Sequence, residues 1–337
     1  NIDLQGMQVD GSYTGPVYLS GKLTPELCQT LMEWQRRQKN LATKHAYEIV
    51  LDVIQVLKHE PTLVEIQLPA HTEITICGDI HGQYYDLLNI FEINGLPSEE
   101  NPYLFNGDFV DRGCFSVEVL LTLFMWKLLY PTKVFLGRGN HEARSMNMLY
   151  GFEGEVTAKY DKSLYELFSE AFCLLPLCHL VNKTVLVLHG GLFSEDGVTL
   201  QNIRSLDRMR EPPYDGLMAD LLWSDPHPGF GRRPSRRGVG VAFGRDVTEE
   251  FMQLNGLSLV IRSHEMKEEG YEVEHGGKLV TVFSAPNYCD QMGNKGAILR
   301  LDADTLSPRF ITFEAAAHPP VSVSAYTMPV LGQLMRG

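Results

Sequence analysis

Short apolar runs alternate with segments of helical periodicity over most of the chain. Glu73 to Cys77 is rich in β-branched residues, and the residues after Gly82 place apolar side chains at helical spacing. Further apolar strands are expected at 103–105, 133–136, 185–188 and 257–261, and a further helix at 116–130. This alternation of strands and helices predicts an α/β fold.

The pattern changes towards the C-terminus. Residues 270–283 are interrupted by Gly276-Gly277 between two runs of strand-forming residues, which predicts a β-hairpin. Two more strands are expected at 297–301 and 309–313. Because these late strands are antiparallel, we predict mixed sheets rather than a purely parallel one.

The ends of the chain differ from its middle. The first residues contain several glycines and no periodicity, whereas Thr24 and Pro25 form an N-cap signal, and a second helix is expected at 43–57. The predicted organisation is a linker or extended arm, a helical lead-in, a main domain and a C-terminal tail, at residues 1–23, 24–64, 65–315 and 316–337 in turn.

Composition narrows the classes of function. The 337 residues are 44% apolar and 21% charged, which is ordinary for a globular protein. A net charge of -13 argues against a general nucleic-acid or membrane surface, and we expect no membrane span. The six cysteines include no C-x-x-C pair, so we expect free thiols and an intracellular protein. The chain begins at Asn1, which suggests processing or truncation.

Polar side chains follow five of the expected strands at their carboxyl ends. These segments are residues 78–82, 106–113, 137–142, 189–191 and 262–265. Any one of them alone is explained by a capped turn or a satisfied core histidine. Five together, at the strand ends where α/β folds bind their ligands, indicate one shared site.

The side chains in these segments suit a pair of metal ions. The candidate ligands are Asp79, His81, Asp108, Asn140, His189 and His264. Carboxylate, amide and imidazole without thiolate favour manganese, iron, zinc or magnesium. Asp79 and His81 can hold one ion. The second ion can be held by Asn140, His189 and His264, and Asp108 can bridge the two ions. Two such ions can share a water and lower its pKa, which is hydrolytic chemistry at phosphorus.

Further residues fit the rest of such a reaction. His141 follows a proposed ligand but should point elsewhere, so we predict that it is the general acid, oriented by Asp111. The alternative for Asp111 is a loop carboxylate satisfied by the backbone. Arg112 and Arg237 are candidates for binding phosphoryl oxygens. Three neighbouring arginines are better explained as solvated surface: Arg232, Arg233 and Arg236.

Six motifs carry a family resemblance: GDIHG (78–82), GDFVDRG (107–113), GNHE (139–142), HGG (189–191), RSHE (262–265) and SAPNYC (284–289). In their order and spacing, residues 65–315 resemble the phosphoprotein phosphatase family of serine/threonine phosphatases. Additional stretches at 87–113, 150–156, 269–278 and 285–296 are similar to one branch of that family, which carries an N-terminal tetratricopeptide region.

The resemblance implies a calcineurin-like metallophosphoesterase fold, with a central β-sandwich flanked by helices and two divalent ions per chain. It implies the same six ligands and the same acid pair, with manganese the ion of choice in vitro. It adds Asn140 to the phosphate contacts. Tyr288, which pattern alone places as a packed loop aromatic, is implied to border the substrate groove. Cys289 is implied to be a thiol neighbour there, not a nucleophile.

The implied activity is hydrolysis of phosphoserine and phosphothreonine monoesters, by in-line attack of a hydroxide that bridges the metals. The implied partners are phosphoprotein substrates and the chaperone heat-shock protein 90, bound through the tetratricopeptide region. We expect that region to be absent here, which would make the chain an open catalytic fragment. Residues 326–337 are expected to pack as a short helix, and the protein to be a monomer of the cytoplasm and nucleus.

Two other functions remain open at this point. The same metal site could cut phosphodiesters or dinucleotide polyphosphates, although the length of the domain and the SAPNYC loop favour a protein substrate. A scaffold that kept the fold and lost catalysis is a third possibility. It is disfavoured because a binding protein has no need of all six ligands together with Asp111 and His141.

Overall fold

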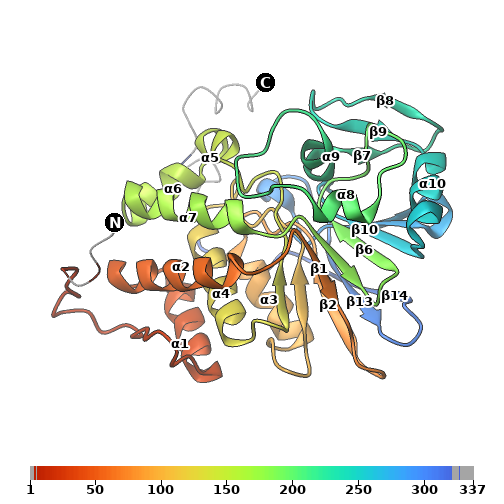
Figure 1. Ribbon diagram of the computed structural model, residues 1–337. Helices are drawn as coiled ribbons and strands as arrows, with labels where there is room; N and C mark the ends of the chain where they lie inside the picture. Colours follow the sequence, from red (N-terminus) through yellow and green to blue (C-terminus); the bar gives the residue numbers. More distant parts are fainter. Residues whose placement is uncertain (1–3, 5, 321–325, 327–337) are drawn as a thin grey trace.

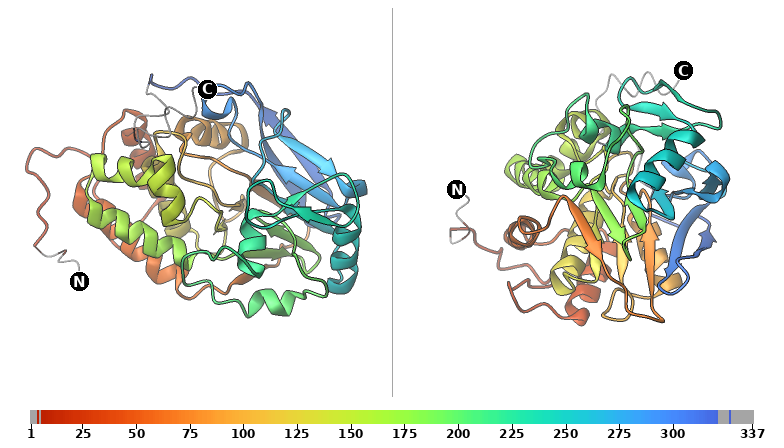
Figure 2. Two further views of the ribbon diagram at one scale, coloured as in Figure 1. Left: turned by 90° about the horizontal axis from the view of Figure 1, so that it is seen from above. Right: turned by 45° about the vertical axis from the view of Figure 1, so that its right-hand side comes forward.

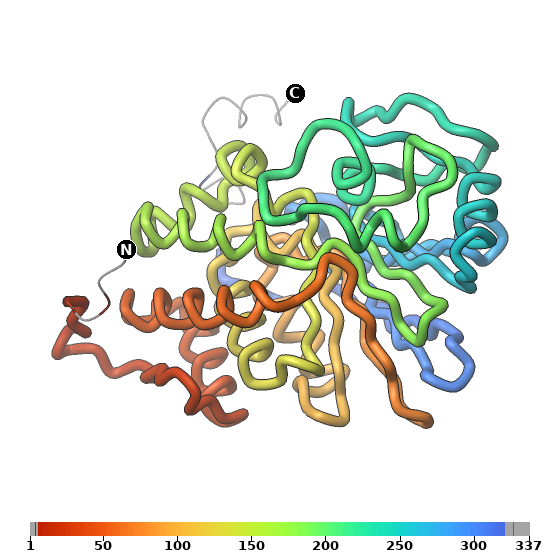
Figure 3. The backbone as a smooth tube through the Cα atoms, in the orientation of Figure 1, coloured from red at the N-terminus to blue at the C-terminus, as the bar shows by residue number. Residues whose placement is uncertain are grey.

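The computed structural model describes residues 4, 6–320 and 326, and Figures 1 and 3 show the course of the chain. An irregular N-terminal arm leads into two helices, after which strands and helices alternate. The helices are α1 (Pro25–Arg36), α2 (Thr43–Leu57), α3 (Tyr84–Asn94), α4 (Ser116–Leu129), α5 (Arg144–Tyr150), α6 (Phe152–Lys159), α7 (Lys162–Leu174), α8 (Leu200–Arg204), α9 (Leu217–Trp223) and α10 (Arg245–Asn255), with short 3-10 turns η1 (His275–Gly277) and η2 (Tyr288–Asp290).

Two mixed sheets form the centre of the molecule. The first has the order β1 (Leu63–Ile66), β5 (Cys178–Val181), β6 (Val185–Leu188), β10 (Leu259–Arg262), β12 (Leu279–Val282) and β11 (Tyr271–Glu274). The second has the order β14 (Pro308–Phe313), β13 (Gly296–Asp302), β2 (Glu73–Cys77), β3 (Tyr103–Phe105) and β4 (Val134–Leu136). A small third sheet contains β7 (Asp225–Pro226), β9 (Val241–Phe243) and β8 (Arg232–Pro234).

The two large sheets pack face to face, because alternate side chains of each strand are apolar on the shared face. Ile74 and Ile76 of β2 lie in one buried cluster with Val185 and Val187 of β6. The opposite faces of both sheets are covered by helices, α1 to α4 with α6 and α7 on the second sheet and α9 and α10 on the first. Figure 2 shows the helices of the first half of the chain gathered on one side of the strands.

Most predicted elements are confirmed, several with the predicted bounds, as at 43–57, 73–77 and 185–188. β11 and β12 pair antiparallel through a turn at Gly276-Gly277, as expected for the hairpin. The strand predicted to begin at 257 begins at Leu259 instead. Residues 257 and 258 instead follow the end of α10, where Gly256 has a left-handed φ of 65° and the Leu257 amide donates to the Met252 carbonyl.

The predicted helical lead-in shares the core of the main domain. α1 begins at the Thr24 cap, whose hydroxyl accepts a hydrogen bond from the Leu27 amide. Ile49 and Val53 of α2 belong to the same buried cluster as the residues of α4 and α7. The chain then enters β1, which pairs in parallel with β5. Helices and sandwich are therefore joined by packing as well as by sequence.

The C-terminal segment is described as far as residue 320. The Ala316 amide donates to Asp86 of α3, and the His318 ring lies 3.0 Å from Asp290. The short helix expected at 326–337 lies outside the described residues, except for Tyr326. Among the helices that are described, none is long and apolar enough to cross a membrane.

Candidate metal centre

The predicted polar segments meet where the carboxyl ends of β2, β3 and β4 approach those of β6 and β10. The turns are held by backbone bonds, since the amides of Ile80 and His81 both donate to the Asp108 carbonyl. His81, Asp108 and His264 have left-handed φ values of 46°, 51° and 70°. Residues other than glycine rarely adopt this conformation, and they do so most often at functional sites.

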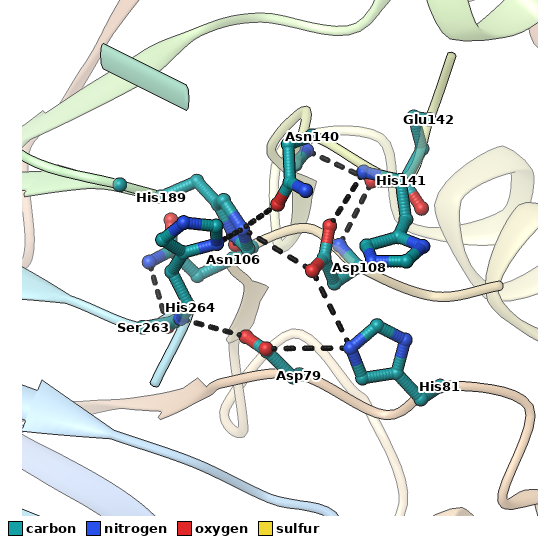
Figure 4. A network of polar contacts seen from close by, with 12 residues as sticks. Asp79, His81, Asn106, Asp108, Asn140, His141, Glu142, His189, Ser263 and His264 are labelled. Carbon is teal, nitrogen blue, oxygen red and sulfur yellow. Dashed lines mark hydrogen bonds and ion pairs between the residues drawn. The ribbon is translucent and has the colours of Figure 1, made fainter. Parts of the chain in front are cut away.

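Asp108 lies at the centre of the cluster, as predicted for a bridging ligand (Figure 4). Its Oδ2 is 3.4 Å from His81 Nε2 and 3.3 Å from His189 Nε2. Its Oδ1 accepts the His141 amide at 2.9 Å. Asp79 completes this side, with Oδ2 3.5 Å from His81 Nε2 and Oδ1 accepting the His264 amide.

The second half of the cluster is formed by three predicted ligands from three different turns. His189 Nε2 lies 3.0 Å from Asn140 Oδ1 and 3.2 Å from His264 Nδ1. All three residues are buried. The structure thus brings all six predicted ligands together.

The donor set fits metal ions, which can be tested on the histidines. Nδ1 of His189 faces the Asn106 carbonyl at 2.8 Å, and Nδ1 of His81 faces the Val110 carbonyl at 2.9 Å. Each Nδ1 must donate there, so Nε2 is the ring atom that faces the carboxylate oxygens. Such a contact is favourable only with positive charge there, supplied either by a metal ion between the atoms or by a proton on Nε2. In addition, His264 turns its Nδ1 to the same group, 3.2 Å from His189 Nε2.

The electrostatics of the cluster agree with this assignment. Burial alone would lower the pKa of His189, but the Asp108 carboxylate outweighs burial and raises that pKa to about 9. Burial, with the Arg237 charge adding to it, lowers the pKa of His264 well below its usual value. Positive charge is therefore stabilised at His189, beside the oxygens that a cation would contact.

His141 lies closer to the cluster than predicted. One of its ring nitrogens lies within 4.8 Å of ligand atoms of His81 and Asp108, and Asp108 also joins a second group with His189 and His264. Its Nδ1, however, is 2.8 Å from Asp111 Oδ2. Proximity arises because the 139–142 turn packs directly on Asp108. The hydrogen bond to Asp111 leaves only Nε2 free for chemistry.

Asp111 is fully buried and held on both oxygens. Oδ1 accepts the amide of Phe152 at 3.0 Å, and Oδ2 accepts Asn147 Nδ2 at 3.1 Å besides facing His141. Asn147 also donates to the His141 carbonyl at 2.7 Å. The predicted contact between His141 and Asp111 is thus present. Sequence reasoning missed Asn147, which lies outside every quoted motif.

An open cleft of about 540 Å³ lies over the cluster. Of the described residues that line it, only Arg112 and Arg237 are arginines, as predicted. Arg112 stacks on Tyr150 at 3.9 Å and its Nε has no partner among the described residues. Arg237 reaches the cleft from the turn between β8 and β9, where Asp225 accepts its Nε at 2.6 Å. The Tyr288 ring lies 5.2 Å from that of His81.

Glu142 is the most important residue that sequence reasoning missed. Its buried carboxylate accepts the amides of Asp108, Phe109 and Gly139, each at 2.8 Å. Burial, together with the charge of Asp108, raises the pKa of Glu142 to about 7. It belongs to the GNHE motif, so its position was visible in the sequence. Its partners were not, since two of them lie more than 30 residues away in the chain.

Comparison with known proteins decides the family. The family model described as Calcineurin-like phosphoesterase matches residues 72–268. The chain belongs to this family. The predicted fold class and family are confirmed, because the fold described above is that of a calcineurin-like metallophosphoesterase domain.

Several curated relatives support a narrower resemblance. The chain is 58% identical over 319 residues to serine/threonine-protein phosphatase 5 of Arabidopsis thaliana, covering 95% of this chain and 59% of that protein. It is 57% identical to serine/threonine-protein phosphatase 5 of Homo sapiens, covering 98% and 66%. Serine/threonine-protein phosphatase T of Schizosaccharomyces pombe is 49% identical, with 98% and 70% covered. The chain therefore spans 59% and 66% of the lengths of the two phosphatase 5 proteins.

Solved structures agree. A protein serine/threonine phosphatase from Saccharomyces cerevisiae, described as similar to human phosphatase PP5, has a TM-score of 0.86 at 40% identity, covering 89% of this chain and 99% of that one. A cold-active protein-tyrosine phosphatase from a Shewanella species has a TM-score of 0.56 at 18% identity and shares the fold alone. The branch indicated by the sequence is thus that of protein phosphatase 5.

One prediction about the N-terminus is not confirmed. The chain was expected to lack the tetratricopeptide region, yet a family model described as PPP5 TPR repeat region matches residues 1–65. In the structure, the helices of this segment are α1 and α2, which pack into the main core. At least part of the region recognised under that description is therefore present.

Proposed function

We propose that the protein is a serine/threonine phosphatase that hydrolyses phosphoserine and phosphothreonine monoesters of proteins. The observation that carries the proposal is the hydrogen-bonded pair His141 and Asp111, which opens on the same cleft as the ligand cluster and the two arginines. The names of the relatives and the closeness of the match over this domain support it. A cleft open to solvent suits a phosphate on a protein chain.

The residues divide the work by position. Arg112, stacked on Tyr150 and with no partner for its Nε among the described residues, binds phosphoryl oxygens, and Arg237, which lines the same cleft, does so too. Asn140 contributes its amide both to the metal cluster and to phosphate binding. Tyr288 lies beside His81 and borders the substrate. His141 donates a proton from Nε2 to the leaving alkoxide while Asp111 holds Nδ1.

The metal pair would be held by the six clustered residues: Asp79, His81, Asp108, Asn140, His189 and His264. Two divalent ions, when bound there, would lower the pKa of a water and stabilise negative charge on the phosphoryl oxygens. The oxygen and nitrogen donors suit manganese, iron, zinc or magnesium, and we propose manganese for assays in vitro.

The division between acid and ligands is tested by two substitutions. His141→Asn should lower kcat on a phosphoserine peptide about 10²- to 10⁴-fold, since a positioned acid contributes that much. Its metal content should stay near that of the wild type, whereas Asp108→Asn should lose metal and activity together. The measurements are elemental analysis and steady-state kinetics with added manganese.

A phosphodiester serves as the control substrate in the same assay. Loss of metal in His141→Asn would show that this residue is a ligand, which its distance from Asp108 makes a real alternative. Faster turnover of the diester than of the peptide would replace the proposed function with phosphodiester hydrolysis. Metal binding without turnover of either substrate would favour a scaffold.

We also propose that the whole protein binds the chaperone heat-shock protein 90 through its tetratricopeptide region. The match of residues 1–65 to the family model of that region supports this partner class. Because the curated relatives are longer than this chain, the partner is a proposal for the full-length protein.

A further inference from the structure

α6 (Phe152–Lys159) contacts the loop that carries Asp111 and Arg112 at several points along one side. The first contact is at the start of the helix, where the Phe152 amide donates to Asp111 Oδ1 at 3.0 Å. This amide belongs to the first turn of α6 and has no partner within the helix. α6 therefore begins directly on the carboxylate that holds the proposed acid.

The second contact is a cap supplied from a distance. α4 begins after Phe115, whose side chain cannot cap the helix. The carboxylate of Glu155, one turn into α6, accepts the amides of Ser116 at 3.1 Å and Val117 at 2.8 Å. Glu155 is almost completely buried, so water cannot replace it. The first amides of α4, at the end of the loop, are thus capped by a residue of α6 and not by the residue that precedes α4.

The third contact is made by Lys159 at the end of α6. Its ammonium donates to the Cys114 carbonyl at 2.9 Å, to Glu118 at 2.7 Å and to Glu155 at 2.8 Å. Only 13% of the side chain is exposed. Two buried carboxylates share this one cation, so both depend on Lys159. The same cation also holds the backbone of the loop.

The loop between these contacts adopts an unfavourable backbone conformation. Asp111 and Arg112 both have a φ of 70°, in the left-handed region that side chains disfavour. Such residues persist only where their surroundings hold them, at about 1 to 3 kcal/mol each. On one side Gly113 donates to the His81 carbonyl at 2.9 Å. The Arg112 amide donates to the Tyr150 carbonyl and the Phe115 amide to the Gly82 carbonyl, each at 3.1 Å. Glu155 and Lys159 make the side-chain contacts on the other side of the loop.

We propose that Lys159 and Glu155 are positioning residues for catalysis, which act through the 111–117 loop on the Asp111–His141 acid pair. The inference rests on the proposed function and adds to it two residues that touch neither substrate nor metal. Without these contacts the loop relaxes, Asp111 turns away from His141 Nδ1, and the acid loses its orientation.

A loss of this kind depends on the leaving group, because a strongly basic alkoxide needs a proton whereas nitrophenolate leaves without one. The experiment compares a phosphoserine peptide with p-nitrophenyl phosphate for Lys159→Met. We expect kcat on the peptide to fall about 10- to 100-fold, as for a displaced catalytic group. On the nitrophenyl ester it should fall less than about threefold. Across substituted phenyl phosphates, the dependence of log kcat on leaving-group pKa should steepen.

Two further variants separate positioning from damage to the buried cluster. Glu118→Gln is the matched control, because Glu118 accepts from Lys159 and, within the described part of the chain, makes no side-chain hydrogen bond to the loop. Burial, with the Glu155 charge adding to it, raises the pKa of Glu118 to about 7, so glutamine resembles its protonated form. This control should keep wild-type kinetics on both substrates. If Lys159→Met folds poorly, the double variant Lys159→Met/Glu118→Gln is assayed in its place. It removes one positive and one negative charge, so the net charge of the cluster stays the same.

Equal losses on both substrates, or no loss on either, would overturn the inference and leave the proposed function intact. Metal content and the melting temperature of each variant, measured in parallel, show whether the site is still assembled. If the wild-type chain hydrolyses neither ester, the proposed function itself fails and the inference falls with it.

Discussion

Buried polar side chains in this protein differ in how many of their polar atoms have hydrogen-bond partners. Glu142 accepts three backbone amides from two turns and is fully engaged. His264 has an Nε2 without a hydrogen-bond partner among the described residues, while its Nδ1 lies 3.2 Å from His189 Nε2 in the ligand cluster. His179 of β5 also has two unpartnered ring nitrogens there, but it lies against Phe135, away from the cleft. An unpartnered ring nitrogen therefore occurs both at a proposed ligand and at a packed ring away from the cleft.

His179 should make the stability of the fold depend on pH. Burial lowers its pKa to about 3, against an ordinary value of 6.5. As the pH falls below 6.5, the unfolded chain binds a proton that the folded chain cannot, so stability is lost with acidification. Between pH 7 and pH 5 this loss is about 2 kcal/mol. His179→Leu should remove this loss. The free energy of unfolding, measured by urea denaturation, should then differ between pH 7 and pH 5 by about 2 kcal/mol less than in the wild type.

His59, which is exposed on the surface after α2, offers a control for the same replacement. His59→Leu measures what the same replacement does to stability where no ring is removed from the core. An unchanged dependence in His179→Leu would mean that the buried ring is protonated in the folded protein.

At the scale of elements, the site depends on how closely strands of different sheets approach. Gly78 follows β2, and a Cβ built there would lie 2.1 Å from the carbonyl oxygen of Val282 in β12. Its amide donates to Ser284 Oγ at 2.8 Å, and Ser284 in turn donates to the Ala297 carbonyl. A residue without a side chain is needed at Gly78 because two backbones meet there, directly before Asp79.

Gly78→Ala should therefore lower the free energy of unfolding by about 1 to 3 kcal/mol or more, through overpacking against backbone atoms that cannot move aside. The measurement is urea denaturation followed by circular dichroism. Gly11→Ala is the control, since nothing lies within 4 Å of a Cβ there, and it should change stability by less than about 0.5 kcal/mol. Equal effects of the two substitutions would mean that the strands separate easily at this point.

At the scale of the whole molecule, the N-terminal helices are part of the main hydrophobic core. Buried residues of α1 and α2 share one cluster with those of α3, α4 and α7. The apolar faces of α1 and α2 are therefore buried against the other helices. The family model described as PPP5 TPR repeat region nevertheless matches this segment. A groove for a chaperone peptide would need further helices.

This arrangement leads to a prediction about the proposed partner. A protein of the full length of the relatives should bind a peptide of the C-terminal tail of heat-shock protein 90. The 337-residue chain should bind it at least about tenfold more weakly, since affinity follows the contacts that a preformed groove supplies. Fluorescence anisotropy with the labelled peptide measures both. Equal affinities would show that residues 1–65 suffice, and no binding by either protein would remove the chaperone from the proposal.

The sequence by itself determined which residues meet in the candidate metal centre. Each of the six ligands follows a strand whose apolar pattern is local, and local pattern sets both the strand and the turn after it. The same holds for the acid pair, because Asp111 and His141 lie in motifs whose residue types suit only a few roles. Helix α2 and strands β2 and β6 were predictable with their bounds for the same reason.

Only the tertiary structure decided what surrounds these residues. It places β2, β3 and β4 in one sheet and β6 and β10 in the other, a pairing set by burial between segments far apart in the chain. It brings His141 near Asp108, engages Glu142 with amides from another turn, and fixes the Asp111 loop to α6. A buried carboxylate or amide is satisfied by whichever partner packing delivers, and no local pattern carries that information.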